Sequence, residues 1–480
     1  MSDSSASAPG ITQNERRFTF LGCLFLAVSM SAFGLSLANI QGTVLESMNG
    51  ADSFSLVTAI SSAALCIMTP VGGSLMDMLG TRKVVLWFGL LVCISAVALA
   101  FVNSLGLYLL LRCLLAGGQG AFASVPFITV RQIYSPDQVP KHTGYLSGAL
   151  AVGGFIGSWF AGFLADRGML GLANAFPAVI LAIGMFLVVK FYPFNDVVAK
   201  KKLDVFGIIL LAATLICLVF ALNYGPTLGW GSHFVLGMLA GCIVAFILLI
   251  YWEKKCQAPL IPLKLFKNKA YVLLLAIAGL CVVYLNAINV YVPQALQQIM
   301  GQSGAVSGTV QIPRTILSVI VPGFAGVWVA RSTGNYWKAL AITAILIILP
   351  MACLVFIGPN MPVWFVFAAL ALTGAADSFR TVATMPAAQS LLNRQDLGIG
   401  TSVVGFVISL AGVLASAIFS IAYNGLVQST PGVEGMTHGI DTVLLISAAA
   451  AGIALLLDFF LFRRIYPKAL QEAQLKNQQK

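Results

Sequence analysis

Long apolar runs alternate with short polar gaps along most of this chain. Fourteen runs are long enough to cross a bilayer as helices, since its hydrocarbon core needs about 20 helical residues. We place them at residues 18–45, 54–78, 84–102, 105–130, 143–165, 172–192, 204–224, 234–252, 270–296, 305–330, 337–357, 363–391, 399–423 and 441–462. Only 9% of the 480 residues are charged, against roughly 25% in soluble domains. The pattern therefore predicts an all-α polytopic membrane protein.

Basic residues gather in alternate gaps. Of the 27 Lys and Arg residues, 23 lie in the N-terminal tail, the even-numbered gaps and the C-terminal tail, or at the helix ends beside them. Arg167 lies in an odd-numbered gap, and three arginines lie inside predicted helices. The positive-inside rule then predicts that both termini are cytoplasmic. The net charge of +11 thus reflects membrane topology and does not indicate a nucleic-acid partner.

The predicted helices group as six, two and six. We expect a cytoplasmic N-terminal tail (1–17) without a signal peptide, a six-helix bundle (18–192), an inserted helix pair with its linkers (193–269), a second six-helix bundle (270–462) and a cytoplasmic C-terminal tail (463–480). No cysteine falls in a predicted outer loop, so we expect no disulfides. The three histidines form no metal-ligand pattern, and no nucleotide-binding or hydrolase motif is present. These observations predict neither an enzyme nor a bound cofactor.

A glycine-rich loop joins the second and third predicted helices. Its key positions are Gly73, Asp77, Gly80, Arg82 and Lys83. This spacing, G-x-x-x-D-x-x-G-x-[RK]-[RK], resembles the signature loop of the major facilitator superfamily. The resemblance implies two six-helix bundles that rock around a site near the bilayer midplane, with this loop acting as a cytoplasmic latch. An ordinary cytoplasmic turn is the alternative.

Other features resemble one branch of that superfamily, the 14-helix drug:proton antiporters. They are the six-two-six layout, the loop Gly229–Ser232 and the connector Ala258–Leu260. The fifth helix carries a pattern similar to the antiporter motif, at Gly144, Gly153, Gly157 and Gly162, with Ser158 and Ala161 replacing a proline and a glycine. This branch implies proton-coupled multidrug efflux in the cell membrane. The glycines are explained equally well as a close-packing helix face.

Four charges lie inside predicted helices, where charge is costly and often functional. Arg112 resembles the superfamily's fourth-helix arginine, which is associated with proton coupling. Asp377 and Arg380 are three residues apart and can pair, and Arg314 lies two helices earlier. Asp377 is the best candidate for a side chain that titrates during transport, because Asp458 is placed at the cytoplasmic end of the last helix. The alternative is a static structural salt bridge.

Polar faces of several helices predict the substrate surface. Helices at both ends of the sequence contribute amides, hydroxyls and a phenol at helical spacing. The candidates are Ser36, Asn39, Gln119, Tyr284, Asn286, Asn289, Gln311 and Thr373. Some of these side chains are equally suited to join helices to one another.

The first helix departs from the multidrug pattern L-D-x-T-x-x-N. Aligned on Asn39, Gly34 stands where the acid belongs and Ser36 where the threonine belongs. The predicted helix interiors hold three arginines and one aspartate, and this surplus of positive charge favours an organic anion, such as a bile-acid-like carboxylate, that is moved with protons, with uptake as one direction. A non-transporting receptor or scaffold is a further alternative. The expected partners are a small-molecule substrate, protons and the lipid bilayer, and the expected state is a monomer.

Overall fold

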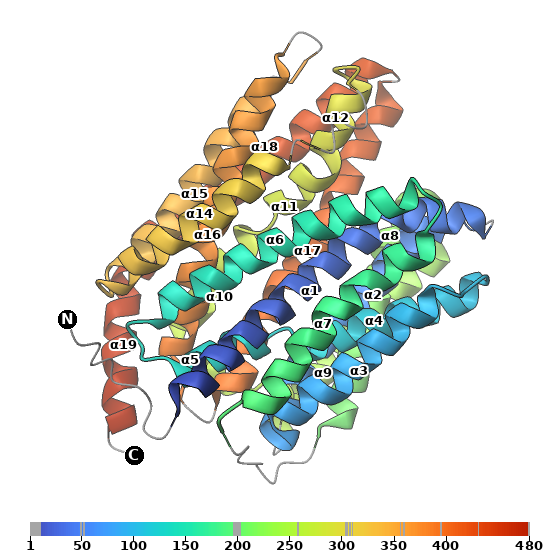
Figure 1. Cartoon of the computed structure of the whole chain (residues 1–480). Helices are drawn as coiled ribbons and strands as arrows, with labels where there is room; N and C mark the ends of the chain where they lie inside the picture. The colour runs from blue at the N-terminus through green and yellow to red at the C-terminus, as the bar shows by residue number, and fades with distance from the viewer. Residues whose placement is uncertain are drawn as a thin grey trace. The chain divides into compact units, whose positions relative to one another are not determined.

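The computed structural model describes residues 11–48, 50, 53–194, 203–256, 259–302, 306, 309, 311–355, 357–358, 361–393, 396–430 and 432–478. Within these residues every regular element is helical (Figure 1). Fourteen helical segments are long and apolar enough to span a membrane. The prediction of an all-α polytopic membrane protein is confirmed. The lysine run 200–202 and Ala258 of the connector lie outside the described residues.

The helices follow the hydrophobic runs. Those of the first part are α1 (Gln13–Ser47), α2 (Phe54–Leu79), α3 (Thr81–Leu99), α4 (Leu105–Phe122), α5 (Val125–Ile133), α6 (Val139–Ala165), α7 (Leu170–Phe191), α8 (Val205–Leu228) and α9 (His233–Lys255). Those of the second part are η2 (Leu263–Lys267), α10 (Lys269–Leu280), α11 (Tyr284–Asn286), η3 (Ala287–Tyr291), α12 (Val292–Gln298), α14 (Ile312–Ala330), α15 (Asn335–Leu354), α16 (Val363–Ser390), α17 (Leu397–Ser429), α18 (Val433–Leu457), η5 (Asp458–Phe462) and α19 (Arg463–Gln478).

Side chains mark several helix starts. Thr12 and Glu15 form a reciprocal capping box at α1, where the Thr12 hydroxyl accepts from the Glu15 N–H at 3.3 Å. Asp204 caps α8 by accepting from the Gly207 N–H at 2.8 Å, and Asn268 caps α10. Each cap satisfies a backbone donor that the helix itself leaves unpaired.

Two predicted helices are interrupted. The run 105–130 divides into α4 and α5, with Pro126 in the first turn of α5. The run 270–296 divides into α10, α11, the π-helix η3 and α12. Pro293 has no N–H to donate, so the backbone cannot continue a regular α-helical ladder through this segment. Ahead of the π-helix, backbone hydrogen bonds join residues three apart, as in a 3₁₀-helix; one runs from the Leu285 N–H to the Val282 carbonyl at 3.0 Å. These bonds wind the backbone more tightly than an α-helix does.

The chain forms two compact units. Unit 1 comprises residues 1–139, 149–265 and 392–406, and unit 2 comprises residues 140–148, 266–391 and 407–480. The helices α6 and α17 each contribute to both units. In unit 1, α1 packs on α7, α2 on α4, and α8 on α9 and α2; in unit 2, α16 packs on α14 and α15. The domain boundaries drawn from the sequence stay a prediction.

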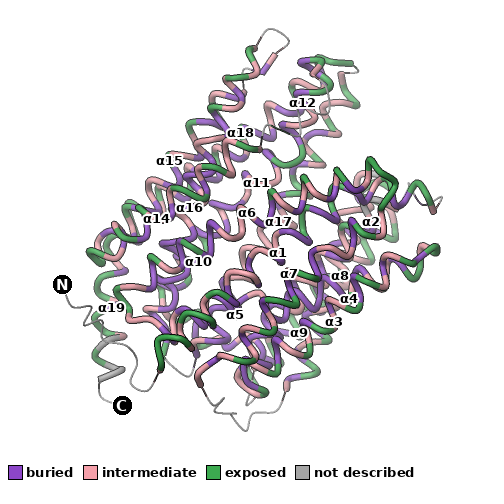
Figure 2. Tube along the Cα trace, in the orientation of Figure 1, coloured by how far each residue is buried: buried purple, intermediate pink, exposed green. Residues whose placement is uncertain are grey.

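Burial separates helices that face protein from helices with an exposed apolar face. Figure 2 colours the chain by how far each residue is buried. Most residues of α16 between Thr373 and Gln389 are buried, whereas α9 exposes Ile243, Val244 and Ile247. Exposed apolar faces on spanning helices are suited to lipid. Residues beyond the last predicted span, expected as a tail, form the helix α19, whose Tyr466 and Leu470 are buried.

Candidate functional site

The glycine-rich loop lies at the junction of α2 and α3 in unit 1. Gly80 has φ of +87°, a left-handed backbone that glycine adopts without strain, so the chain turns here in one residue. Arg82 donates a hydrogen bond to the Tyr192 carbonyl, and Lys83 is exposed. The arginine thus joins the loop to the end of α7.

Asp77 lies against the first turn of α17. This turn belongs to unit 1, as Asp77 does. A Cβ built on Gly398 would lie 2.6 Å from Asp77 Oδ1, and one on Gly73 would lie 2.5 Å from Ser402 Oγ. Glycine at both positions lets the two helices approach closely. Because a helix N-terminus carries partial positive charge, the carboxylate of Asp77 is attracted to the start of α17.

The glycines of α6 lie at close helix contacts. A Cβ on Gly153 or Gly157 would lie 2.2 Å from the Val28 carbonyl or 2.4 Å from the Ala32 carbonyl of α1. In unit 2, a Cβ on Gly144 would lie 2.5 Å from the Pro322 carbonyl of α14. Gly162 has more room, with Asn39 Nδ2 at 3.4 Å. Three of the four glycines therefore set helix-to-helix distances.

Arg112 is a buried cation in unit 1. Its side chain on α4 donates to Gln41 Oε1 of α1 at 2.9 Å, and Gln41 donates to Thr58 Oγ1 of α2 at 2.8 Å. Arg112 Nε and the hydroxyl of Tyr108, one turn earlier, have no hydrogen-bond partner among the described residues. No ion pair joins Arg112 to an acidic side chain among the described residues. Sequence reasoning missed Gln41, whose only signal was an amide inside an apolar helix.

The other polar candidates of unit 1 join helices in this conformation. Ser36 is wholly buried and donates to the Ala173 carbonyl of α7 at 2.7 Å. Asn39 donates to the Ser158 carbonyl of α6 at 3.0 Å. Gln119 is buried and donates to the Met30 carbonyl at 3.4 Å. Among the hydrogen bonds of the described residues, none joins Ser36, Asn39 or Gln119 to Arg112.

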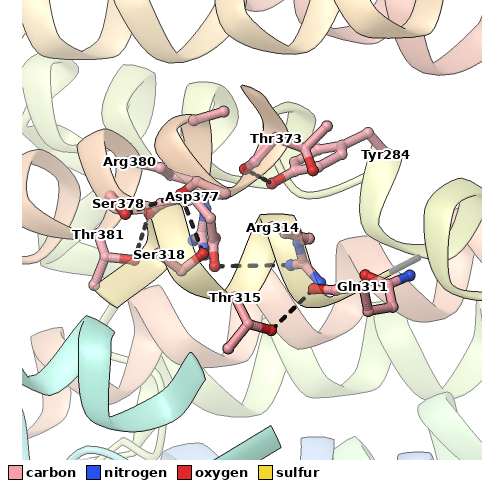
Figure 3. Close-up of polar contacts among 12 residues, drawn as sticks. Tyr284, Gln311, Arg314, Thr315, Ser318, Thr373, Asp377, Ser378, Arg380 and Thr381 are labelled. Atoms are coloured by element: carbon pink, nitrogen blue, oxygen red, sulfur yellow. Dashed lines mark hydrogen bonds and ion pairs between the residues drawn. The ribbon is translucent and has the colours of Figure 1, made fainter. Parts of the chain in front are cut away.

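Unit 2 contains a cluster of three charges, which we call the ion cluster: Arg314 of α14 with Asp377 and Arg380 of α16 (Figure 3). Arg380 Nε donates to Asp377 Oδ1 at 3.1 Å, and its terminal nitrogen donates to the same oxygen. Arg314 lies on the other carboxylate oxygen, 3.9 Å from Asp377 Oδ2. The side chains are between 11% and 23% exposed. The ion cluster therefore carries one negative and two positive charges.

A glycine brings α14 and α16 together at the ion cluster. A Cβ on Gly374 would lie 2.1 Å from the Arg314 carbonyl oxygen, so only glycine fits here. Ser318 donates to the Gly374 carbonyl at 3.2 Å, which adds a polar contact between the same two helices. This close approach places Arg314 within reach of Asp377.

The interrupted helix supplies further polar groups. Tyr284, in the first residue of α11, is fully buried and donates to the Thr373 carbonyl at 3.3 Å. Tyr284 interacts electrostatically with all three charges of the ion cluster. Asn286 donates to the Gly412 carbonyl of α17 at 2.9 Å, and Asn289 is exposed. Tyr284 thus interacts with the ion cluster from α11, whereas Asn286 joins α11 to α17.

Two remaining candidates differ in their surroundings. Thr373 is fully buried and donates to the Leu370 carbonyl at 2.6 Å within its own helix. Gln311, one turn before Arg314, donates to the Ile288 carbonyl of η3 at 3.0 Å, while its Oε1 lacks a partner among the described residues. Gln311 therefore offers a free acceptor beside the ion cluster.

The sequence places Asp458 near the cytoplasmic end of the last predicted helix, beside Arg463, and this location stays a prediction. Asp458 is fully buried, with 0% exposure, because the helix continues through η5 into α19 and surrounds this position with neighbours. Arg463 lies 4.7 Å from the centre of the Trp337 ring.

Fourteen helical segments suited to span a membrane among the described residues, with charged side chains packed between helices within each of two compact units, define a polytopic membrane protein. The family model described as Major Facilitator Superfamily matches residues 20–416, and the chain belongs to this superfamily. The family recognised from the sequence is therefore confirmed. The superfamily consists of transporters, not enzymes.

Named relatives are efflux and multidrug proteins. Multidrug resistance protein 3 of Bacillus subtilis is 25% identical over 338 residues, which cover 70% of this chain and 66% of the relative. The probable actinorhodin transporter of Streptomyces coelicolor is 24% identical over 468 residues, covering 93% of this chain and 79% of the relative. The Bacillus multidrug transporter protein MdtP is covered over 58% of its length. The matches to the two Bacillus relatives thus span less than two thirds of those proteins.

Solved structures share the fold. The proton:xylose symporter XylE has a TM-score of 0.66 at 14% identity, covering 93% of this chain and 96% of that one. A bacterial homologue of the iron transporter ferroportin has a TM-score of 0.64 at 13% identity, covering 93% and 98%. Together with the fourteen candidate spans, these matches confirm the predicted major facilitator fold.

Proposed function

We propose that this chain is a proton-coupled secondary transporter that exports small amphipathic organic compounds across the cell membrane by alternating access. The observation that carries the proposal is Asp377 held between two arginines from two different helices. The multidrug and efflux relatives support export of organic compounds. Both termini are cytoplasmic in this proposal, and the transporting unit is a monomer.

Protonation of Asp377 provides a way to couple protons to helix movement. Two unit charges about 4 Å apart attract by about 4 kcal/mol at an effective dielectric constant of 20, before the cost of desolvation. Arg314 lies at this distance and belongs to α14, whereas Asp377 belongs to α16. A proton on the carboxylate removes the attraction for both guanidiniums. Binding or release of one proton therefore alters the force that holds α14 to α16.

The substrate meets groups that lie next to these charges. Tyr284 interacts electrostatically with the ion cluster, and Gln311 presents a free carbonyl oxygen beside it. A substrate that binds here competes electrostatically with the proton on Asp377. On the cytoplasmic side, the attraction between Asp77 and the start of α17 acts as the latch of the transport cycle.

Transport into proteoliposomes under an imposed pH gradient tests this proposal. A labelled lipophilic cation is compared with a labelled amphipathic carboxylate, and the gradient is reversed for each. We expect gradient-driven accumulation in the wild type and its loss in Asp377→Asn. The exposed acid Asp166 provides the control, since Asp166→Asn removes one carboxylate without touching a buried charge. Full accumulation by Asp377→Asn would refute the proposed role.

A second candidate function is proton-coupled movement of an organic anion, including uptake. The observation that favours it is Arg112, a buried cation that pairs with no acid among the described residues. The ion cluster adds a further excess positive charge, and buried positive charge attracts carboxylates. Accumulation of the labelled carboxylate alone, abolished by Arg112→Gln, would favour this candidate. Accumulation of the cation alone would exclude it.

A further inference from the structure

A second buried carboxylate lies outside the ion cluster. Asp458 is the first residue of the π-helix η5, near the end of the last span, and is 0% exposed. Neither carboxylate oxygen has a hydrogen-bond partner among the described residues. An isolated carboxylate in an apolar interior is so unfavourable that such a group takes up a proton instead. The surroundings of Asp458 therefore suit a neutral carboxylic acid.

No base in the neighbouring elements reaches into this site. The elements packed on η5 are α10, α15, α18 and α19. The lysines and arginines of these elements whose side chains the structure describes are all exposed: Lys269, Lys338, Arg463, Arg464 and Lys468. The acids and histidine of these elements (Glu434, His438, Asp441 and Glu472) are exposed or partly exposed. The buried titratable groups on or next to these elements are thiol and phenol groups: Tyr271, Cys281, Tyr336 and Tyr466.

Cys281 connects Asp458 with the ion cluster electrostatically. Its thiol directly follows α10, is 0% exposed, and interacts with both Arg380 and Asp458. Arg380 is the residue that holds Asp377. A change of charge on Asp458 therefore alters the electrostatic environment of Cys281, which also interacts with Arg380 of the Asp377–Arg380 pair.

The backbone at Asp458 is suited to local change. A π-helix widens the backbone ladder and often marks a functional position within a helix. Here it occupies Asp458–Phe462, between two regular helical segments. A shift between π- and α-helical geometry would rotate Asp458 relative to its neighbours.

We propose that Asp458 is a proton-binding site, occupied at neutral pH in this conformation, which exchanges its proton during the transport cycle. The bound proton follows from the burial of this one carboxyl and its lack of partners among the described residues. The exchange of the proton rests on the proposed function of the chain as a proton-coupled transporter.

Infrared difference spectroscopy of the full-length protein in lipid nanodiscs tests the occupied site. At neutral pH, the wild-type spectrum minus that of Asp458→Asn should contain the carbonyl-stretch band of one protonated carboxylic acid. The matched control is Asp377→Asn, whose difference spectrum should contain the bands of an ionised carboxylate, because Asp377 is ion-paired. Carboxylate bands for Asp458, or no band, would overturn the proposal.

Folding of the variants is itself informative. Asn has the shape of a protonated Asp, so Asp458→Asn should retain the elution profile and unfolding temperature of the wild type. If it fails to fold, Asp458→Glu replaces it, and the protonated band should shift in frequency rather than disappear. A spectrum of Asp458→Glu in which no protonated band differs from the wild type contradicts the occupied site.

Transport measurements test the exchange of the proton. Asp458→Asn should lose pH-driven accumulation while keeping substrate counterflow, which needs no net proton movement. Unchanged pH-driven accumulation would refute the exchange and leave the infrared result standing. A wild type that transports none of the probes would count against the proposed function, whereas the infrared bands would still decide whether Asp458 holds a proton.

Discussion

Replacement of Gly374 by alanine tests whether the absence of a Cβ at this position allows α14 and α16 to approach closely enough to form the ion cluster. The added Cβ would lie 2.1 Å from the Arg314 carbonyl oxygen, whereas ordinary contact begins at 3.4 Å. Because the atom it meets is backbone, no side-chain rotation relieves the overlap. The helices α14 and α16 must therefore separate by about 1 Å at this point.

Two effects add to the expected loss of stability. Overpacking of a tight interior costs about 1–3 kcal/mol. Separation of Arg314 from Asp377 by a further ångström, from 3.9 Å, weakens their attraction by about 1 kcal/mol at an effective dielectric constant of 20. The better helix propensity of alanine offsets about 1 kcal/mol of this. We expect a net loss of about 2 kcal/mol, or an unfolding temperature lower by roughly 2 °C for a chain of this length.

Thermal unfolding with a thiol-reactive fluorogenic dye measures the effect, since Cys281 and Cys23 are buried and react once the protein opens. The control is Gly323→Ala on α14, where an added Cβ would meet nothing within 4 Å. Gly323→Ala should unfold at the wild-type temperature or slightly above. Equal unfolding temperatures for the two alanine variants would show that Gly374 does not set the distance between α14 and α16.

Four further substitutions test three other parts of the fold, each followed by thermal unfolding. Gly80→Ala places a Cβ at φ of +87° and should destabilise by about 1–2 kcal/mol; an unchanged unfolding temperature would show that the turn relaxes freely. Trp252→Phe removes the indole N–H that donates to Asp204 Oδ1 at 2.7 Å and should cost about 1.5–3 kcal/mol, since the acceptor is a carboxylate. Gly157→Ala should destabilise by about 1–3 kcal/mol and Gly162→Ala far less, because their added Cβ atoms would lie 2.4 Å and 3.4 Å from the nearest atom; the reverse order would contradict the packing of α6 on α1.

The spanning helices could be predicted from the sequence because membrane burial imposes long apolar runs. The interruption at residues 281–291 could not be predicted in the same way. Hydropathy is continuous there, and the local tightening and widening depend on the missing N–H of Pro293 together with tertiary contacts. The helix α19 was missed because it is polar, and only its packing through Tyr466 and Leu470 distinguishes it from a tail.

The candidate site was partly predictable. The spacing of Asp377 and Arg380 predicted an ion pair within one helix, and that pair is present. The contact of Asp377 with Arg314 depends on the approach of α14 at Gly374, which no local pattern reveals. The burial of Asp458 could not be predicted for a related reason, because the elements packed on η5 include α10 and α15, which are distant in the sequence.

The composition of unit 1 has a consequence for how the protein is made. Residues 392–406 belong to unit 1 but are synthesised after most of unit 2. The groups that face Gly73 and Asp77, at Ser402 and Gly398, are supplied by this late segment. A ribosome that has completed only residues 1–265 has therefore made an unfinished unit, because its contact at Gly73 and Asp77 forms only after α17 is synthesised. Co-expression of the two halves as separate chains should accordingly leave each half dependent on the other for its final structure.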